Sequence, residues 1–350
     1  MLALRRAEHF FLRLGVERAE LEDIISRKSD FIRPLVLWDP DKPSKPRAVI
    51  SCRGRLRKLQ NRLLKEILAP KLRPTKYSYG GVKGRDAKRN ALRHVRNYYL
   101  YKTDISDFFP SISHHRVYRL FTERLTCCPD VSHFSTELCT FNGHLALGLP
   151  TSPILSDQFL WKVDERIAKW CANERLRYTR FVDDIVISGK RRIRPTVKAL
   201  ITKVLQQSGF RVHKNKSFAQ TIGVDAVVTG AQLGVGFVCV DERVCLRIAS
   251  HIDDVDGLTK GIRPTTGVYF DKQQLLGKAR YVRYIDPVAG SHLVSRIESL
   301  DWNQVEANAE QLDAISVRKE LLSPGVNPAW FDRLCALKPA KEESVTPTLL

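Results

Sequence analysis

The sequence contains no apolar run long enough to cross a bilayer. Its most apolar stretch, residues 227–240, is too short for a membrane span and includes Thr and Gln. The N-terminal segment also lacks a long apolar core, and its glutamates argue against a transit peptide. We therefore expect a cytoplasmic protein with no membrane partner.

Cysteine pairs of the C-x-x-C type are missing as well. The chain has eight cysteines, and no two of them form a C-x-x-C pair. Zinc ligands normally come as paired clusters, so we favour reduced cysteines in a cytosolic chain. The less favoured alternative is a zinc site built from Cys127, Cys128, His133, Cys139 and His144.

Acidic residues are scarce relative to basic ones. The chain has 58 Lys and Arg against 38 Asp and Glu, a formal net charge of +20. A field of that sign attracts polyanions, so nucleic acid is the first partner that we expect. With 350 residues, 43% of them hydrophobic, the chain can build a sizeable core in two or three domains.

Two aspartates stand side by side where strand-forming residues would otherwise be buried. Asp183 and Asp184 lie between Phe181-Val182 and an Ile-Val-Ile run, which predicts a two-residue turn between two strands. Like charges this close raise each other's proton affinity unless a cation lies between them. Oxygen ligands suit Mg²⁺, although an Asp pair in a turn is by itself usually a solvated loop.

A third carboxylate strengthens the metal hypothesis. Residues 100–105 alternate as a strand that carries Asp104 at its end, about 80 residues before the pair. Strands separated by a mostly helical connection can converge on one sheet. Three carboxylates there could hold two divalent ions, one activating a sugar hydroxyl and one stabilising the leaving pyrophosphate. Together with the basic charge, this pattern indicates nucleotidyl transfer.

Local patterns predict the remaining elements. Leu12, Val16 and Ala19 recur at helical spacing in a segment that ends near residue 29. Asp86 and Ser113 stand where each would cap a helix. We further expect two short strands within 33–50, an amphipathic helix over 55–68, a helix after the GLPTSP segment, a helix near 195–207, a hairpin at 224–240 and helices from residue 241.

Four segments, in this order and at this spacing, resemble reverse-transcriptase motifs A, B, C and D. They read YKTDISDFFPSI, LGLPTSPILSD, RFVDDIVISG and SGFRVHKNKS. The F-x-D-D core is unspecific alone, whereas the ordered set is highly specific, and the resemblance extends from about residue 30 to 290. It implies a mixed α+β, right-hand polymerase with fingers, a palm built on an antiparallel sheet, and a helical thumb.

The resemblance also implies a domain organisation. We expect an N-terminal helical segment (1–30), fingers (31–99), a palm (100–240) with a fingers insertion near 122–146, a thumb (241–335) and a mobile tail (336–350).

Several site residues follow from matching motif positions. Asp104, Asp183 and Asp184 would be the catalytic metal ligands, assisted by the Ile105 carbonyl, for two Mg²⁺ ions, with Mn²⁺ as an alternative. Phe109 would block a 2′-hydroxyl on the incoming nucleotide; its other interpretation is core packing, a role that we assign to Phe108.

Other matched positions would bind the nucleotide or the template. Arg47 and Lys42 would contact the triphosphate, although Lys42 fits a solvated basic turn equally well. Lys216 matches the motif D lysine that could protonate pyrophosphate, with Lys214 as its rival. Gly148 begins a turn, ending at Pro153, that would lie beneath the template–primer pair.

Two segments narrow the resemblance to retron reverse transcriptases. NALRH (90–94) matches their N-A-x-x-H signature and VTG (228–230) matches their second signature. Asn90 and His94 lie one helical turn apart and share a face. The alternative for NALRH is an ordinary polar helix face. The alternative for VTG is a strand followed by a turn glycine. The implied RNA-binding residues here are Asn90, His94, Val228, Thr229 and Gly230.

The thumb segment LLGKARYVRYIDP resembles the family's G-K-x-x-Y-I stretch. Its basic residues alternate with Tyr281 and Tyr284, a pattern that suits a duplex backbone, with a solvated basic helix face as the alternative. The implied nucleic-acid contacts are Lys278, Arg280 and Arg283.

Three positions depart from the family pattern. Leu147 stands where the family usually has Gln, and this change removes an amide next to the nucleotide site. Phe181 and Val182 stand where Tyr and Ala are common. Because no metal ligand is lost, we expect activity with altered efficiency or fidelity.

The resemblance implies a retron reverse transcriptase. Such an enzyme copies part of its cognate structured non-coding RNA into DNA, starting from a guanosine 2′-hydroxyl, and yields branched RNA-linked single-stranded DNA (msDNA). Its partners would be that RNA, the RNA–DNA product, dNTPs and a separate effector protein in anti-phage defence.

Three alternatives remain. Another defence-associated reverse transcriptase making untemplated or repetitive DNA is kept open by the unusual motif B. A group II intron maturase is less favoured, because no adjoining DNA-binding or endonuclease segment is visible. A non-catalytic RNA-binding scaffold with a polymerase fold is opposed by the retention of all three carboxylates.

Overall fold

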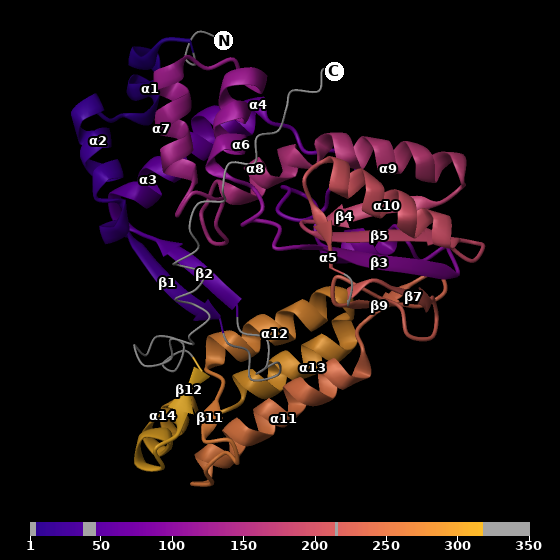
Figure 1. Cartoon of the computed structure of the whole chain (residues 1–350). Coiled ribbons are helices and arrows are strands. Elements are labelled where there is room, and N and C mark those ends of the chain that lie inside the picture. The colour runs from indigo at the N-terminus through magenta and orange to yellow at the C-terminus, as the bar shows by residue number, and fades with distance from the viewer. Residues whose placement is uncertain (1–4, 38–46, 214–215, 318–350) are drawn as a thin grey trace.

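The structure is a computed structural model that describes residues 5–37, 47–213 and 216–317 (Figure 1). Helices and mostly antiparallel strands make up this part of the chain. The expected tail at 336–350 lies outside the described residues. None of the described helices is long and apolar enough to cross a membrane.

The N-terminal helices form one layer. The expected single helical segment is two helices, because Gly15 adopts a left-handed conformation (φ 57°) that ends the first. Within the first helix, Phe10 and Leu14 form the buried face, and Leu12 is 79% exposed. This layer comprises α1 (Ala7–Leu14), α2 (Arg18–Ser26), η2 (Lys28–Phe31), α3 (Gly54–Arg62), η3 (Leu63–Leu68), α4 (Ala69–Lys71) and α7 (Pro129–Cys139).

The two strands expected within 33–50 form an antiparallel hairpin. β1 (Ile32–Leu37) pairs with β2 (Arg47–Cys52), in register from Ile32 opposite Cys52 to Leu37 opposite Arg47. The amphipathic segment that follows buries the four residues of its apolar stripe, as expected from their helical spacing. These residues are Leu56, Leu59, Leu63 and Ile67.

A five-stranded antiparallel sheet lies at the centre of the molecule. Its order is β4-β5-β3-β6, and β7 also pairs with β3. Its strands are β3 (Tyr99–Ser106), β4 (Arg177–Phe181), β5 (Asp184–Gly189), β6 (Arg211–Val212) and β7 (Phe218–Thr221).

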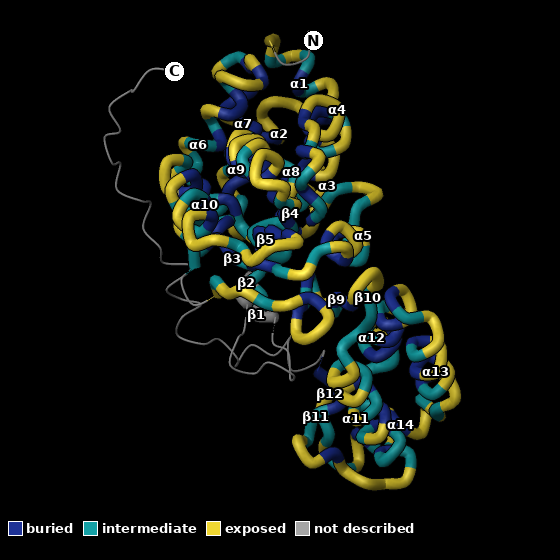
Figure 2. Tube along the Cα trace, turned by 90° about the vertical axis from the view of Figure 1, so that its right-hand side faces the viewer, coloured by how far each residue is buried: buried dark blue, intermediate teal, exposed yellow. Residues whose placement is uncertain are grey.

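Alternation along β5 explains why the sheet is buried on both faces. Ile185 and Ile187 pack into a core that includes residues of α9 (Trp161–Asn173) and α10 (Pro195–Gln207). Val186 points the other way, into a separate apolar cluster with Ala91 and Val228. Figure 2 shows buried residues within the sheet around β4 and β5.

The cluster on the second face joins short elements. α5 (Ala87–Leu92) is capped by the Asp86 carboxylate, and α6 (His114–Arg119) by the Ser113 hydroxyl, as expected. The hairpin expected at 224–240 is a three-stranded meander of β8 (Val227–Val228), β9 (Ala231–Leu233) and β10 (Val238–Cys239). Two further elements, η4 (Leu120–Arg124) and α8 (Ser152–Phe159), lead towards α9.

The C-terminal helices form a bundle with its own apolar cluster. In Figure 1 the bundle extends away from the central sheet. Asp271 and Gln274 form a capping box at the start of α12, and Asp286 caps α13. The bundle consists of α11 (Glu242–Thr259), α12 (Lys272–Ile285), α13 (Pro287–Glu298) and α14 (Trp302–Gln311), with a parallel pair of β11 (Val268–Tyr269) and β12 (Ile315–Ser316).

Candidate active site

The central sheet brings the three aspartates together. Asp104, near the end of β3, lies directly opposite Asp184, the first residue of β5. The backbone N–H of Ile105 donates to the Asp183 carbonyl at 3.2 Å. Residues distant in the sequence therefore occupy neighbouring backbones at one end of the sheet.

The turn that carries the aspartates is strained. Phe181 pairs with Asp184, so the two turn residues are Val182 and Asp183, not the aspartate pair itself. Val182 has φ 58°, which is unfavourable for a β-branched side chain. A Cβ added to Gly80 would lie 2.6 Å from the Val182 nitrogen, so glycine lets the 78–80 segment pack directly on this turn.

A buried arginine holds the strained turn. Arg180 is 1% exposed, and its Nη1 donates to the Val182 carbonyl at 2.7 Å. Its Nε and Nη2 donate to Asp164 at 2.8 Å each, and Nη2 also donates to Asp157 at 2.6 Å. Thr75 and Tyr178 donate to the same Asp164 carboxylate, each at 2.6 Å. Charge-assisted bonds in a buried setting fix the turn beside Asp183.

Sequence reasoning missed this network. Its signal was the presence of charged residues, Asp157, Asp164 and Arg180, inside segments whose pattern otherwise calls for apolar residues. Buried charges of that kind are almost always paired, so Asp157 in motif B, Asp164 in the helix that follows and Arg180 in motif C could have indicated a contact.

The carboxylates strongly influence one another. Burial raises the pKa of Asp183 to about 6, and the negative charge of Asp104 is the next contribution. Burial also raises the pKa of Asp184, against the opposing charge of Lys102. The site therefore concentrates negative charge on buried and half-buried carboxylates, a setting that favours a bound cation.

Two lysines face these carboxylates. Lys216 forms an ion pair with Asp104, and the Lys102 Nζ lies 3.7 Å from the Asp184 Oδ2. Within the described residues, no three acidic, His or Cys side chains already converge as a ready metal-binding set. The donor set nevertheless fits Mg²⁺ chemically, because all its atoms are hard oxygens. The Lys216 side chain that pairs with Asp104 is 55% exposed.

The remaining motif A and B residues lie around this site. The ring of Phe109 is half-buried and lies 5.4 Å from that of Phe108, which belongs to the core. Gly148 has φ 105°, and a Cβ there would collide with the Ile50 carbonyl oxygen. The preceding Leu147 carbonyl accepts from the Ile50 N–H at 2.8 Å, so the motif B turn packs against β2.

Only some of the predicted nucleotide-binding residues lie in the described part of the chain. Arg47 begins β2, and its backbone pairs with Leu37. Lys42 and Lys214 lie outside the described residues. Nucleotide contacts by Arg47, Lys42 and Lys216 stay predictions.

The N-A-x-x-H residues lie inside the protein. His94 is fully buried; its Nδ1 lies 2.7 Å from the Ser188 hydroxyl and its Nε2 lies 2.7 Å from the Thr179 hydroxyl. Burial lowers the pKa of His94 to about 3, so the ring is neutral. Asn90 is equally buried. Both side chains are closed off from the surface in this structure, so RNA binding by Asn90 and His94 stays a prediction that their burial does not support.

The second signature packs against the first. Val228 is buried as well, so its RNA contact stays a prediction that its burial does not support, whereas Gly230 is exposed at φ 85°. The Thr229 hydroxyl donates to the Ala87 carbonyl of α5 at 3.0 Å. Tyr281 of α12 donates to the Thr229 carbonyl at 3.0 Å. The two signatures thus form one junction with the C-terminal bundle.

The thumb residues divide into two groups. Tyr284 donates to Asp86 at 3.0 Å, so this tyrosine, like Tyr281, joins α12 to the α5 region. Lys278 is half-buried with its Nζ 4.4 Å from the centre of the Phe270 ring. Arg280 and Arg283 are exposed on α12, where their contact with nucleic acid stays a prediction.

Comparison with known protein families assigns this chain to one of them. The family described as "Reverse transcriptase (RNA-dependent DNA polymerase)" matches residues 39–244, more than half of the 350 residues. The chain belongs to the reverse transcriptase family. It is an RNA-directed DNA polymerase with a mixed α+β polymerase fold.

Similar curated proteins indicate which kind of reverse transcriptase this chain resembles. Retron Mx65 reverse transcriptase of Myxococcus xanthus is 27% identical over 313 residues, 83% of this chain and 71% of that protein. Retron Se72 reverse transcriptase of Salmonella heidelberg is 29% identical over 192 residues, 55% of this chain and 50% of that protein. Retron Ec86 reverse transcriptase of Escherichia coli is 28% identical over 188 residues, 52% of this chain and 58% of that protein. These similarities support a retron-type reverse transcriptase.

Proposed function

We propose that this chain copies part of a cognate structured non-coding RNA into single-stranded DNA that stays linked to that RNA. The observation that carries the proposal is the register of the central sheet, which sets Asp104 opposite Asp184 and beside Asp183. The retron relatives and the +20 net charge support RNA as the partner and template.

The three aspartates and the Ile105 carbonyl would hold two Mg²⁺ ions, or Mn²⁺. When bound, the ions supply activation of the attacking hydroxyl and stabilisation of the pyrophosphate leaving group. Arg180 keeps the turn in the conformation that presents Asp183. Lys216, released from Asp104, becomes available as the proton donor to pyrophosphate. Phe109 limits room at the sugar of the incoming dNTP, and Arg47 and Lys42 contact its phosphates.

The wider role extends the same proposal. Product DNA would remain joined to the RNA through a guanosine 2′-hydroxyl, and the complex would act in anti-phage defence in the cytoplasm with a separate effector protein. The relatives' names identify them as retron enzymes, and that similarity supports this role.

Co-purification tests the proposal. The chain is produced together with the DNA flanking its gene, isolated, and its bound nucleic acid is sequenced before and after RNase treatment. We expect one defined RNA joined covalently to single-stranded DNA. Active enzyme recovered with neither molecule would overturn the retron assignment.

A second candidate function rests on motif B. Leu147, which stands where the family has Gln, is 39% exposed beside Gly148. An exposed apolar side chain at that position offers no amide to the template or nucleotide. This favours, as the alternative, a defence-associated reverse transcriptase that makes untemplated or repetitive DNA. DNA sequence that matches the RNA would exclude it, and repeats absent from the RNA would support it.

A further inference from the structure

A basic pocket lies at the far end of β4 from the catalytic turn. It has a volume of about 490 Å³ and is lined by the 76–79 segment, the end of the α5 region, the C-terminal part of α9 and the first residues of β4. We call it the β4 pocket. Its lining includes four cationic side chains and no Asp or Glu. These four are Lys76, Arg93, Arg175 and Arg177.

The arginines of the β4 pocket lack internal counter-charges. Within residues 5–37, 47–213 and 216–317, Arg93, Arg175 and Arg177 form no hydrogen bond or salt bridge through their side chains. Elsewhere on the same strand, Arg180 contacts two aspartates. Cations that converge without an acidic partner leave a positive potential in the cavity, which attracts an anion from outside the chain.

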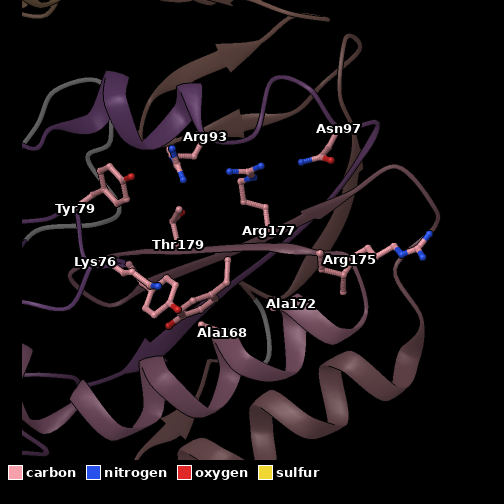
Figure 3. A pocket seen from close by; sticks show the side chains of 12 residues that line it. Lys76, Tyr79, Arg93, Asn97, Ala168, Ala172, Arg175, Arg177 and Thr179 are labelled. Atoms are coloured by element: carbon pink, nitrogen blue, oxygen red, sulfur yellow. The ribbon is translucent and has the colours of Figure 1, made fainter.

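The side chains are arranged around a shared space. Figure 3 shows Arg93 and Arg177 turned towards one another, with Asn97 alongside, whereas Arg175 points away. The Asn97 Nδ2 donates to the Ser188 hydroxyl at 2.7 Å, so its side chain is oriented by the sheet. The charges of Arg177 and Arg93 also lower the pKa of the buried His94 behind them, after the larger effect of burial. The positive charges of both guanidinium groups are therefore felt at the same buried side chain.

The chemistry of the lining favours a nucleic-acid backbone. Two guanidinium groups match the paired oxygens of a phosphate diester, and their planar forks can donate to it bidentately. Tyr79 and Lys76 line the same pocket, and an aromatic ring beside a phosphate site suits a ribose or an unstacked base. An acidic protein segment would match the charge but gain less from this ring.

The pocket is separate from the catalytic centre. Arg177 and Phe181 are the two ends of β4, about 13 Å apart along the extended strand, and the turn that carries Asp183 follows Phe181. A phosphate held here cannot be that of the reacting nucleotide. We infer that the β4 pocket binds a backbone phosphate of the cognate RNA and anchors that RNA away from the catalytic aspartates. This inference rests on the proposed function, because it requires an RNA partner.

The test replaces the two converging arginines together, Arg93→Gln with Arg177→Gln, in the full chain. Affinity for the RNA that co-purifies with the wild type is measured across a series of salt concentrations. We expect at least about tenfold weaker binding, and a slope of log affinity against log salt that is smaller by about 1 for each lost phosphate contact. DNA synthesis on a short annealed primer–template, which does not extend to the pocket, should remain at the wild-type rate.

Two controls match this variant. Arg175→Gln removes a lining charge that points away from the shared space, and Lys203→Gln removes an exposed charge on α10. Both should bind RNA within about twofold of the wild type, as expected for solvated surface charges. If the double variant binds no worse than these controls, the inference is wrong.

Photo-crosslinking identifies the occupant. A photoreactive residue at Lys76 should crosslink to one segment of the co-purified RNA. A crosslink to a protein instead would overturn the inference in favour of an acidic protein partner. Failure of the wild type to bind any defined RNA would contradict the proposed function itself, whereas specific RNA binding unaffected by the double variant would contradict only the pocket assignment.

Discussion

Arg177 and Arg180 lie on the same strand, yet their surroundings are opposite. Arg180 is buried, contacts two aspartates and donates to the turn that carries Asp183. Arg177 is exposed at the β4 pocket and has no acidic partner within the described residues. A buried arginine with paired carboxylates stabilises a backbone position, whereas a group of unpaired arginines marks where negative charge from outside the chain belongs.

The largest expected effect is that of Arg180→Met, which removes the buried arginine of this pair. Asp157 and Asp164 would be left without their cation, so the free energy of unfolding should fall by about 3–5 kcal/mol. Chemical denaturation measures it. Arg177→Met, the same substitution on the same strand, is the matched control. A loss below about 1 kcal/mol for Arg180→Met would show that the buried network does not stabilise the turn.

The next effect concerns the geometry of the turn itself. Gly80→Ala places a methyl group against the Val182 backbone and shifts the turn that carries Asp183. A displacement of about 1 Å should lower the DNA synthesis rate about 100-fold. Gly277→Ala is the control, because an added Cβ there meets nothing within 4 Å. Equal synthesis rates for the two variants would contradict tight packing at the turn.

A smaller effect should appear in the pH dependence of stability. His94 has a folded-state pKa of about 3, below its ordinary value near 6.5, so the unfolded state binds the extra proton between these pH values. Stability therefore falls as the pH decreases through this window. Between pH 7 and pH 5, the wild type should lose about 2 kcal/mol more than His94→Gln. Parallel stability curves for the two proteins would show that His94 is not neutral and buried.

The smallest effect on folding is expected from Arg177→Met. Because this side chain is exposed and unpaired, the free energy of unfolding should change by less than about 0.5 kcal/mol. Thermal unfolding of the purified chain without RNA measures it. A large loss would show that Arg177 has a structural partner, and the contrast with Arg180 would disappear.

The sequence allowed the prediction of elements whose pattern is local. Alternation located β3, the Ile-Val-Ile run located β5, and matching motif positions indicated that Asp104 and the 183–184 turn would meet. The strands of the 224–240 region are two or three residues long, too short for an alternation pattern to distinguish a meander from a hairpin. The helical spacing of apolar residues continues across Gly15, so this spacing did not indicate that the first helix ends there.

Tertiary pairing limited the rest of the prediction. His94 looked like part of a polar helix face because its partners, Ser188 and Thr179, lie on strands distant in the sequence. Arg180 looked like an ordinary charged residue in a motif until Asp157 and Asp164 were placed beside it. The β4 pocket combines four separate segments, and no local pattern could indicate that Arg93 and Arg177 face one another there.

Replacing both turn aspartates, Asp183→Asn with Asp184→Asn, tests the central claim most directly. DNA synthesis on a primed RNA template and affinity for the same RNA are measured with Mg²⁺ present, with Asp130→Asn on α7 as the control. Synthesis should disappear while RNA affinity stays within about twofold of the control, because the proposed role of the carboxylates is to hold metal ions and not the RNA backbone. DNA synthesis that persists in the double variant would contradict the assignment of this turn as the catalytic centre.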